Sequence, residues 1–149
     1  MNLLAPVSSI MTSKVITVSP NDSLAEVNDI FKKHKIHHLP VVKERKLIGI
    51  ISKSDINLFL KWWNNDKYQD LSNSVRLMNY KAEDIMTKGL AKLEPTDRIN
   101  VAVKVFEENL FHAIPVVNNE GELEGIVTTY DLIKLMAAED HARILALKN

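Results

Sequence analysis

Apolar residues in this chain follow two different spacings, and each spacing occurs in two places. Intervals of three and four residues put apolar side chains on one face of a helix. These helical stripes are Leu24, Val27, Ile30 and Phe31, and then Ile99, Ala102, Val105 and Phe106. Short apolar runs rich in β-branched residues predict strands. The runs are residues 15–18, 39–42 and 47–51, and then 90–93, 114–117 and 123–127.

The two sets of elements belong to an internal repeat. Ile10-Met11-Thr12 recurs as Ile85-Met86-Thr87, 75 residues later. Further pairs at this offset are Pro20 and Pro95, Asp22 and Asp97, His37 and His112, and Pro40 and Pro115. Gly49 recurs as Gly125 at an offset of 76, so one extra residue lies in a turn of the second copy, around residues 118–121. A constant offset that changes only at a turn indicates a duplication.

Each copy predicts the order β-α-β-β-α. The first helix is expected to start at Asp22/Ser23 in one copy and at Thr96/Asp97 in the other. Ser23 and Glu26 have the spacing of a capping box. The second helix is expected to start near Ser52 or Thr128, where a hydroxyl residue follows the last strand. The predicted fold class is therefore α/β (α+β).

The repeat also predicts how the chain divides. Repeat 1 covers residues 5–63, residues 64–79 form a linker, and repeat 2 covers residues 80–136. Asn64-Asn65-Asp66 is typical of a helix break or turn at the start of that linker. Residues 137–149 continue the last helix as a C-terminal extension, and its Ile144, Leu145 and Leu147 are expected to pack back on the body.

Composition narrows the class of protein. The 149 residues are 46% hydrophobic and 26% charged, which is ordinary for a globular domain. Nineteen basic residues balance 19 acidic ones, so no net charge attracts nucleic acid or an acidic membrane. There is no cysteine, and no apolar run approaches the roughly 20 residues that cross a bilayer. The start of the chain does not resemble a secretory signal, and the expected location is cytoplasmic.

One motif carries the candidate chemistry. Gly49-Ile50-Ile51-Ser52-Lys53-Ser54-Asp55 and Gly125-Ile126-Val127-Thr128-Thr129-Tyr130-Asp131 each place a hydroxyl, a carboxylate and free backbone N–H groups where a strand turns into a helix. This arrangement suits an anion beside a polyol, as in the ribose-phosphate part of a nucleotide. The same residues also fit a plain capping box with aspartate in place of glutamate. Both interpretations hold together if a cap yields to a ligand.

These motifs together resemble the cystathionine β-synthase (CBS) domain. The resemblance rests on the repeated Ile-Met-Thr start, the His-x-x-Pro-Val-Val strand and the Gly-h-h-[Ser/Thr]-x-x-Asp stretch (h for apolar), and covers about residues 5–136. Two copies in tandem resemble a Bateman module, in which the repeats pack about a pseudo-twofold axis. The resemblance implies a regulatory module that binds AMP, ADP, ATP or an S-adenosyl ligand in clefts between the repeats. It also implies a homodimer, and often a module without a catalytic domain.

The resemblance also assigns roles to single residues. Asp55 and Asp131 match the aspartate that binds the ribose hydroxyls, and Ser52 and Thr128 match the hydroxyl that contacts phosphate. Lys53 of the first copy matches Thr129 of the second. A lysine in place of this neutral residue favours a more phosphorylated ligand in the first site. The positions that match the adenine-lining strands are Val15, Ile16, His38, Pro40, Leu90, Ala91, Ala113 and Pro115. Ala113 lacks the polar side chain of His38, so the two sites are not expected to be equal.

Other features have simpler interpretations. His37 and His38 are neighbours on a strand and point to opposite faces, which disfavours a metal site near His34. The basic cluster of residues 32–35 at a helix end more simply answers the helix dipole than binds nucleic acid. Trp62-Trp63 favours an interface or core over base stacking. No nucleophile elbow or P-loop is present, and we expect neither catalysis nor a catalytic cofactor.

The sequence leaves three candidate functions for this chain. The first is an adenosyl-ligand sensor that alters conformation or the affinity for a regulated protein partner. The second is a ligand-free module that only mediates oligomerisation, for which the melting temperature is independent of nucleotides. The third is a nucleic-acid-binding module, which predicts salt-dependent retention on nucleic acid; the balanced charge argues against it.

Overall fold

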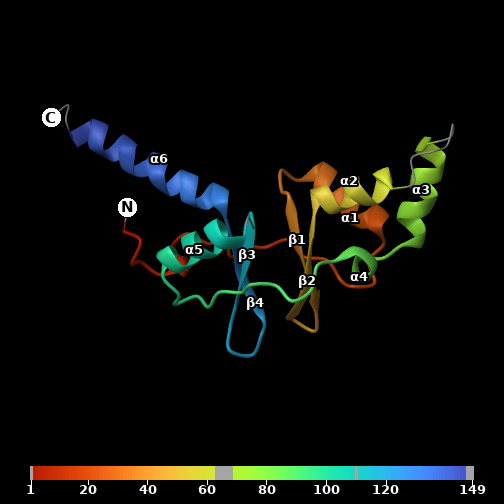
Figure 1. Cartoon of the computed structure of the whole chain (residues 1–149), viewed down its shortest axis with the longest axis horizontal. Helices are drawn as coiled ribbons and strands as arrows, with labels where there is room; N and C mark the ends of the chain where they lie inside the picture. Colours follow the sequence, from red (N-terminus) through yellow and green to blue (C-terminus); the bar gives the residue numbers. More distant parts are fainter. Residues whose placement is uncertain (1, 63–68, 110, 147–149) are drawn as a thin grey trace. The chain divides into compact units, whose positions relative to one another are not determined.

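The computed structural model describes residues 2–62, 69–109 and 111–146. The chain forms two compact units, and neither has the bounds of a sequence repeat. One unit runs from Ile16 to Leu90, and the other joins the segment up to Val15 with the part from Ala91 onward. Figure 1 labels the elements of both, and they confirm the predicted mixed fold of helices and short strands.

The unit from Ile16 to Leu90 is built around one hairpin. Its elements are α1 (Leu24–Lys33), β1 (His38–Lys43), β2 (Lys46–Ser52), α2 (Lys53–Lys61), α3 (Gln69–Asn79) and α4 (Ala82–Ile85). Strands β1 and β2 pair antiparallel, with His38 opposite Ser52 and Lys43 opposite Lys46. Glu44 and Arg45 close the hairpin at φ 50° and 70°, the left-handed conformation that a two-residue turn demands of its central residues.

Helix α1 begins where the capping box predicts. The Ser23 Oγ accepts from the backbone N–H of Glu26 at 3.3 Å, and the Glu26 carboxylate accepts from the N–H of Ser23 at 2.8 Å. These bonds satisfy two of the donors that a helix start leaves unpaired. The helix therefore begins at Leu24, and its apolar stripe faces the core.

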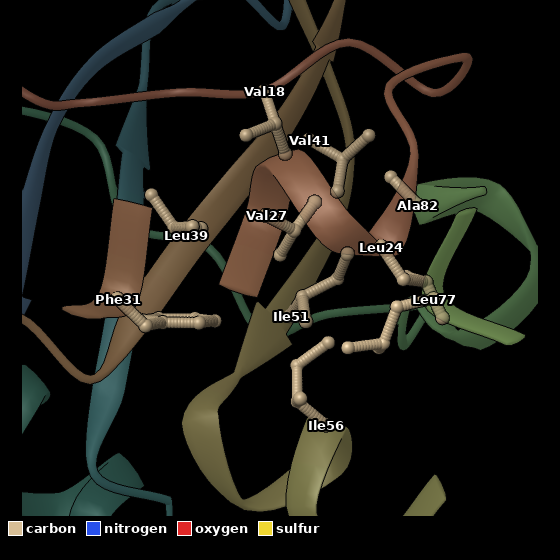
Figure 2. Packing of buried hydrophobic residues seen from close by; sticks show 10 residues of the cluster. All are labelled: Val18, Leu24, Val27, Phe31, Leu39, Val41, Ile51, Ile56, Leu77 and Ala82. Carbon is tan, nitrogen blue, oxygen red and sulfur yellow. The ribbon is translucent and has the colours of Figure 1, made fainter. Parts of the chain in front are cut away.

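The core of this unit lies between helix α1 and the hairpin. Val27 and Leu24 from α1 meet Leu39, Val41 and Ile51 from the strands (Figure 2). The other buried members are Val18, Phe31, Ile56, Leu77 and Ala82. Leu77 belongs to α3, so the segment expected as a linker contains a helix that contributes to the core. Asn64-Asn65-Asp66, the predicted break, lies outside the described residues.

The second unit repeats the same plan. It contains the 3-10 turn η1 (Val7–Ser9), α5 (Ile99–Asn109), β3 (Ala113–Val117), β4 (Leu123–Thr128) and α6 (Thr129–Ala146). Its buried core comprises Val7, Leu93, Ile99, Ala102, Phe106, Ile114, Val116 and Val127. Val42 pairs with Leu47 in the first hairpin and Val117 with Leu123 in the second, so the extra residue lies in the predicted turn. Gly121, at φ 79°, accommodates it.

Each Ile-Met-Thr segment packs on the hairpin of the other sequence copy. Thr12 bridges Ile126, and Thr87 bridges Ile50. A Cβ atom on Gly125 would lie 2.6 Å from the Sδ of Met11, and one on Gly49 would lie 2.6 Å from the Sδ of Met86. Both glycines are therefore required for close approach of a methionine side chain. The Ile-Met-Thr motif of one copy therefore packs against the glycine of the Gly-h-h-[Ser/Thr]-x-x-Asp motif of the other copy.

Three predicted boundaries differ from the structure. The strands expected at residues 15–18 and 90–93 reduce to one bridged residue each, Val18 opposite Val41 and Leu93 opposite Val116. The reason is a turn that follows at once, closed by a bond from the Asp97 N–H to the Glu94 carbonyl in the second copy. Helix α5 starts at Ile99 rather than at Thr96/Asp97, because the Asp97 carboxylate accepts the Glu94 N–H at 2.7 Å within that turn.

Helix α6 extends past residue 136 and ends at Ala146. Leu132 and Leu135 pack against the core of its unit. The side chains of Ile144 and Leu145, and all of Leu147, lie outside the described residues.

Candidate ligand-binding site

The first hydroxyl–aspartate pair lies where β2 becomes α2. Ser52 has extended backbone angles (φ −96°, ψ 158°) and is the N-cap of the helix. Its Oγ accepts from the N–H of Asp55 at 3.1 Å, and the Asp55 Oδ2 accepts from the N–H of Ser52 at 2.7 Å. Both side chains are half-buried. In the described part of the chain, the Asp55 Oδ1 and the Ser52 hydroxyl proton have no hydrogen-bond partner.

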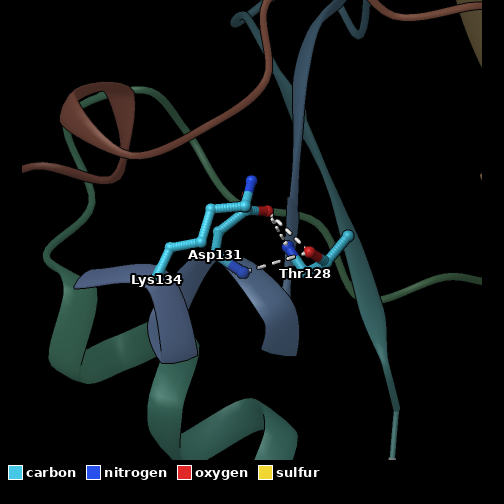
Figure 3. A network of polar contacts seen from close by, with 3 residues as sticks. All are labelled: Thr128, Asp131 and Lys134. Atoms are coloured by element: carbon cyan, nitrogen blue, oxygen red, sulfur yellow. Dashed lines mark hydrogen bonds and ion pairs between the residues drawn. The ribbon is translucent and has the colours of Figure 1, made fainter. Parts of the chain in front are cut away.

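The second pair, at the start of α6, is more fully bonded. The Asp131 Oδ2 accepts from the Thr128 N–H at 2.8 Å and from the Thr128 hydroxyl at 2.6 Å. The Asp131 Oδ1 accepts from the Lys134 Nζ at 3.1 Å (Figure 3). Asp131 is only 7% exposed, whereas the Lys134 side chain is 56% exposed. Both oxygens of this carboxylate therefore already have donors.

Lys134 is the residue of this site that the sequence interpretation missed. Its signal was present, because a lysine three residues after an aspartate on a helix reaches back to it. Leu58 occupies the matching position in the first copy and has no donor to offer. The Lys134 Nζ also lies 4.6 Å from the centre of the Tyr130 ring, a cation–π distance. The two sites differ in an ion pair that the repeat alone does not reveal.

Backbone bonds join each pair to the strand before it. His38 lies opposite Ser52 in the first hairpin, and Ala113 lies opposite Thr128 in the second. The His37 carbonyl accepts from the N–H of Lys53 at 2.9 Å. Lys53 itself is exposed as the first residue of α2. Ser52, Lys53, Asp55 and His38 are thus brought together at one end of the hairpin.

The other predicted adenine-lining residues are placed differently. Pro40 and Pro115 are buried. Their carbonyls accept from the N–H groups of Val18 at 3.1 Å and of Leu93 at 3.0 Å, so they serve the bridges of the fold. Val15, Ile16, Leu90 and Ala91 lie where the chain passes from one compact unit to the other. Within the described residues, no hydrogen bond joins these four to either pair.

The capping interpretation is confirmed for both pairs, since each has the reciprocal bonds of a capping box. Capping does not use every acceptor, and a helix N-terminus keeps a partial positive charge. The expectation of free backbone N–H groups is wrong for most of this helix start, because the N–H groups of Ser52, Lys53 and Asp55 already have acceptors. At the first pair a free carboxylate oxygen adjoins the positive end of the helix. An arrangement of this kind can bind a diol through the carboxylate and an anion through the helix start.

Comparison with protein families decides what the repeat is. The family model of the CBS domain matches two segments, residues 7–61 and 82–138, which together make up more than half of the chain. The chain belongs to the CBS domain family. It carries a tandem pair of CBS domains, as the motifs predicted.

Relatives of the CBS pair differ widely in length. An uncharacterized protein of Methanocaldococcus jannaschii, MJ1426, is 32% identical, and the alignment covers 87% of this chain and 90% of that protein. An inosine-5′-monophosphate dehydrogenase of Korarchaeum cryptofilum is 33% identical over 83% of this chain but only 23% of its own length. MJ1225 of M. jannaschii is matched over 45% of its length. The chain therefore spans less than half of several relatives that it matches.

Solved structures share the fold of this CBS pair. The crystal structure of MJ1225 from M. jannaschii has a TM-score of 0.79 at 25% identity, covering 91% of this chain and 49% of that one. The CBS domain pair of protein MJ0100 has a TM-score of 0.74 at 27% identity, covering 91% and 98%. That structure is a complex with 5′-methylthioadenosine and S-adenosyl-L-methionine.

Other features of the CBS pair were candidates for chemistry. Within the residues that the structure describes, no group of three His, Cys, Asp or Glu side chains is arranged to hold a metal ion. His34 and His37 are exposed. Trp62 is 80% exposed at the end of α2, and Trp63 lies outside the described residues. No helix in the described ranges is both long enough and apolar enough to span a bilayer.

Proposed function

We propose that this CBS pair is a regulatory sensor of an adenosyl ligand, either AMP, ADP or ATP or an S-adenosyl compound. The observation that carries the proposal is the hydroxyl–aspartate pair at the N-terminus of α2, with its counterpart at α6. Asp55 and Asp131 would accept hydrogen bonds from the ribose hydroxyls, which an ionised carboxylate does without a donor of its own. Ser52, Lys53 and Thr128 would contact phosphate at the helix starts.

The ligand class has support from a relative with the same fold. The CBS pair of MJ0100, at 27% identity, was solved with two adenosyl compounds. Binding would be regulatory rather than catalytic: a ligand shifts a conformational equilibrium only by its differential affinity for the two states. The consequence would be a changed shape or a changed affinity for a protein partner. No residue of this proposal acts on a covalent bond.

The alternative is a ligand-free module that only assembles with copies of itself. Tyr130, Ile133 and Met136 support it, because they form an exposed apolar stripe along α6. Such a stripe also fits the homodimer expected of the sensor. Assembly alone therefore does not separate the two functions, whereas the response to nucleotides does. A nucleic-acid-binding role has less support, since basic and acidic residues balance at 19 each.

Thermal unfolding with a ligand panel tests the sensor. The panel is AMP, ADP, ATP, S-adenosylmethionine and 5′-methylthioadenosine. A ligand at 100 times its Kd adds about 2.7 kcal/mol to the free energy of unfolding, which for a chain of this size raises Tm by roughly 5–10 °C. We expect such a shift with at least one compound, and Asp55→Ala or Asp131→Ala should reduce it.

The aspartate variants need a control, because each also removes a helix cap. Glu26→Ala is matched to them: it breaks the capping box of α1, which has the same reciprocal bonds. It should lower Tm by a similar amount, but it should leave the ligand-induced shift unchanged. If no compound raises Tm of the wild type, the sensor proposal is wrong and the assembly module takes its place.

A further inference from the structure

Three basic positions of the first CBS repeat are acidic or neutral in the second. Lys32 and Lys33 in the last turn of α1 correspond to Glu107 and Glu108 in α5. Lys53 at the start of α2 corresponds to Thr129 at the start of α6. The charges of Lys32 and Lys33 cancel those of Glu107 and Glu108 in the net charge of zero, so this difference emerges only when the copies are compared.

The basic residues of the first repeat lie close to its hydroxyl–aspartate pair. The His37 carbonyl accepts from the Lys53 N–H at 2.9 Å, which fixes the loop after α1 beside the start of α2. Lys35 is two residues from His37, and Lys33 is four. At about 3.5 Å per residue, their backbones lie within roughly 7 and 14 Å of that bond, comparable with a Debye length of about 8–10 Å.

These lysines are also available to an anion. Lys32, Lys33, Lys35 and Lys53 are all exposed. None of them forms an ion pair within the described residues. In the second repeat, Glu107 and Glu108 are exposed instead, and Glu108 lies 3.8 Å from the Nζ of Lys104. A phosphate chain would therefore meet lysines without a carboxylate partner in the described part of the first repeat, whereas in the second repeat Lys104 lies near Glu108 and Lys134 is paired with Asp131.

Asp55 and Asp131 also differ in whether both carboxylate oxygens already have hydrogen-bond donors. Within the described residues, Asp55 keeps its Oδ1 free, and the Ser52 hydroxyl proton has no acceptor. The Asp131 Oδ1 is paired with Lys134 at 3.1 Å, and the Thr128 hydroxyl donates to Oδ2 at 2.6 Å. A ribose diol can bind Asp55 directly, but at Asp131 it must displace an ion pair.

From these differences we propose that the two sites are not equivalent. The Ser52–Lys53–Asp55 site selects nucleotides with several phosphate charges, of the nucleoside di- or triphosphate class. The Thr128–Asp131 site does not bind them. This inference rests on the proposed function and adds to it which site responds and to what class of ligand. Its physical basis is the attraction between each phosphate charge and the four lysines, which grows with the number of phosphates.

Calorimetric titration of the full chain with adenosine, AMP, ADP and ATP tests the proposal. At about 50 mM salt we expect the affinity to rise at least tenfold from adenosine to ATP, and to fall for ATP as salt increases. Asp55→Ala should abolish ATP binding, while Asp131→Ala should leave it within twofold of the wild type. The reverse pattern for the two aspartates would overturn the assignment.

Charge variants separate this inference from the proposed function. The triple variant K32E/K33E/K53T gives the first repeat the residues of the second. It should weaken ATP binding at least tenfold and leave adenosine binding within twofold. The control is K43E/K46E, which changes exposed lysines at the opposite end of the same hairpin and should leave both affinities unchanged. Adenosyl binding that ignores phosphate number overturns this inference alone, whereas no binding by any compound overturns the proposed function as well.

Discussion

At the scale of single residues, one carboxylate arrangement recurs at the starts of α1, α2, α4 and α6. Glu26, Asp55, Asp84 and Asp131 each accept the backbone N–H of the residue three positions earlier, at 2.7–2.8 Å. The spacing that suggested a ribose-binding aspartate is therefore also the spacing of an ordinary helix cap. What distinguishes a candidate binding residue is the carboxylate oxygen that the cap leaves free. That property depends on residues such as Lys134, which a motif does not include.

Glu26 allows the cap itself to be tested through pH. Hydrogen bonds from the Ser23 backbone N–H, and then from its hydroxyl, lower the Glu26 pKa from the usual 4.5. Because the folded pKa is the lower one, the cap stabilises the fold above about pH 4.5, and this contribution is lost as pH falls through the folded pKa. Glu26→Gln should therefore lower Tm at pH 7, and the difference from wild type should shrink at pH 3.

The control for this pH series is Glu94→Gln. The Glu94 side chain is exposed and accepts no hydrogen bond within the described residues. Its effect on Tm should be small at both pH values. A difference between wild type and Glu26→Gln that stays constant from pH 7 to pH 3 would contradict a charged cap.

At the scale of elements, sequence patterns predicted the helices and hairpins whose ends are determined by bonds between residues close in sequence. The hairpins and the helices α1, α2 and α6 begin within a residue or two of the predicted positions, because capping boxes and apolar runs rich in β-branched residues are visible in the sequence. The strands at residues 15–18 and 90–93 were predicted too long, since in the described part of the chain only Val18 and Leu93 of these segments form a bridge with β1 or β3. Helix α3 was missed because its apolar residues are mixed with polar ones and several remain exposed.

The methionine–glycine contact yields a prediction at this scale. In Gly49→Ala the new Cβ would lie 2.6 Å from the Met86 Sδ and 3.0 Å from the Thr87 carbonyl oxygen. Overpacking of this kind typically costs about 1–3 kcal/mol, so urea unfolding should show a lower free energy of unfolding.

A double-mutant cycle tests whether the methionine causes that loss. Met86→Ala should be destabilising alone, because Met86 packs against the core of its unit. In the double variant Gly49→Ala/Met86→Ala the side-chain part of the clash is gone. The two losses should therefore fall short of additivity by at least about 0.5 kcal/mol. Strictly additive losses would show that the glycine is needed for another reason.

At the scale of the whole molecule, the sequence repeat and the compact units divide the chain differently. Sequence similarity assigns each residue to one of the two repeats. Packing instead joins the segment up to Val15 with the part from Ala91 onward in one compact unit. Periodicity reveals that a segment has an apolar face, but it does not reveal which core receives that face. Val7 shows this: it lies before the first repeated motif and is fully buried with Leu93 and Ile99.

Native-state hydrogen exchange of the Val7→Ala variant tests whether the segment up to Val15 packs with the part of the chain from Ala91 onward. Removing two buried methyl groups and leaving a cavity costs about 2 kcal/mol, and a loss of that size accelerates exchange roughly 30-fold in the affected unit. Because Val7 packs with the core under β3 and β4, amides of those strands should accelerate more than those of β1 and β2. Val27→Ala, in the core of the other unit, should give the opposite pattern. If Val7→Ala accelerates β1 and β2 as much as β3 and β4, the segment up to Val15 stabilises both units and the division by packing is wrong.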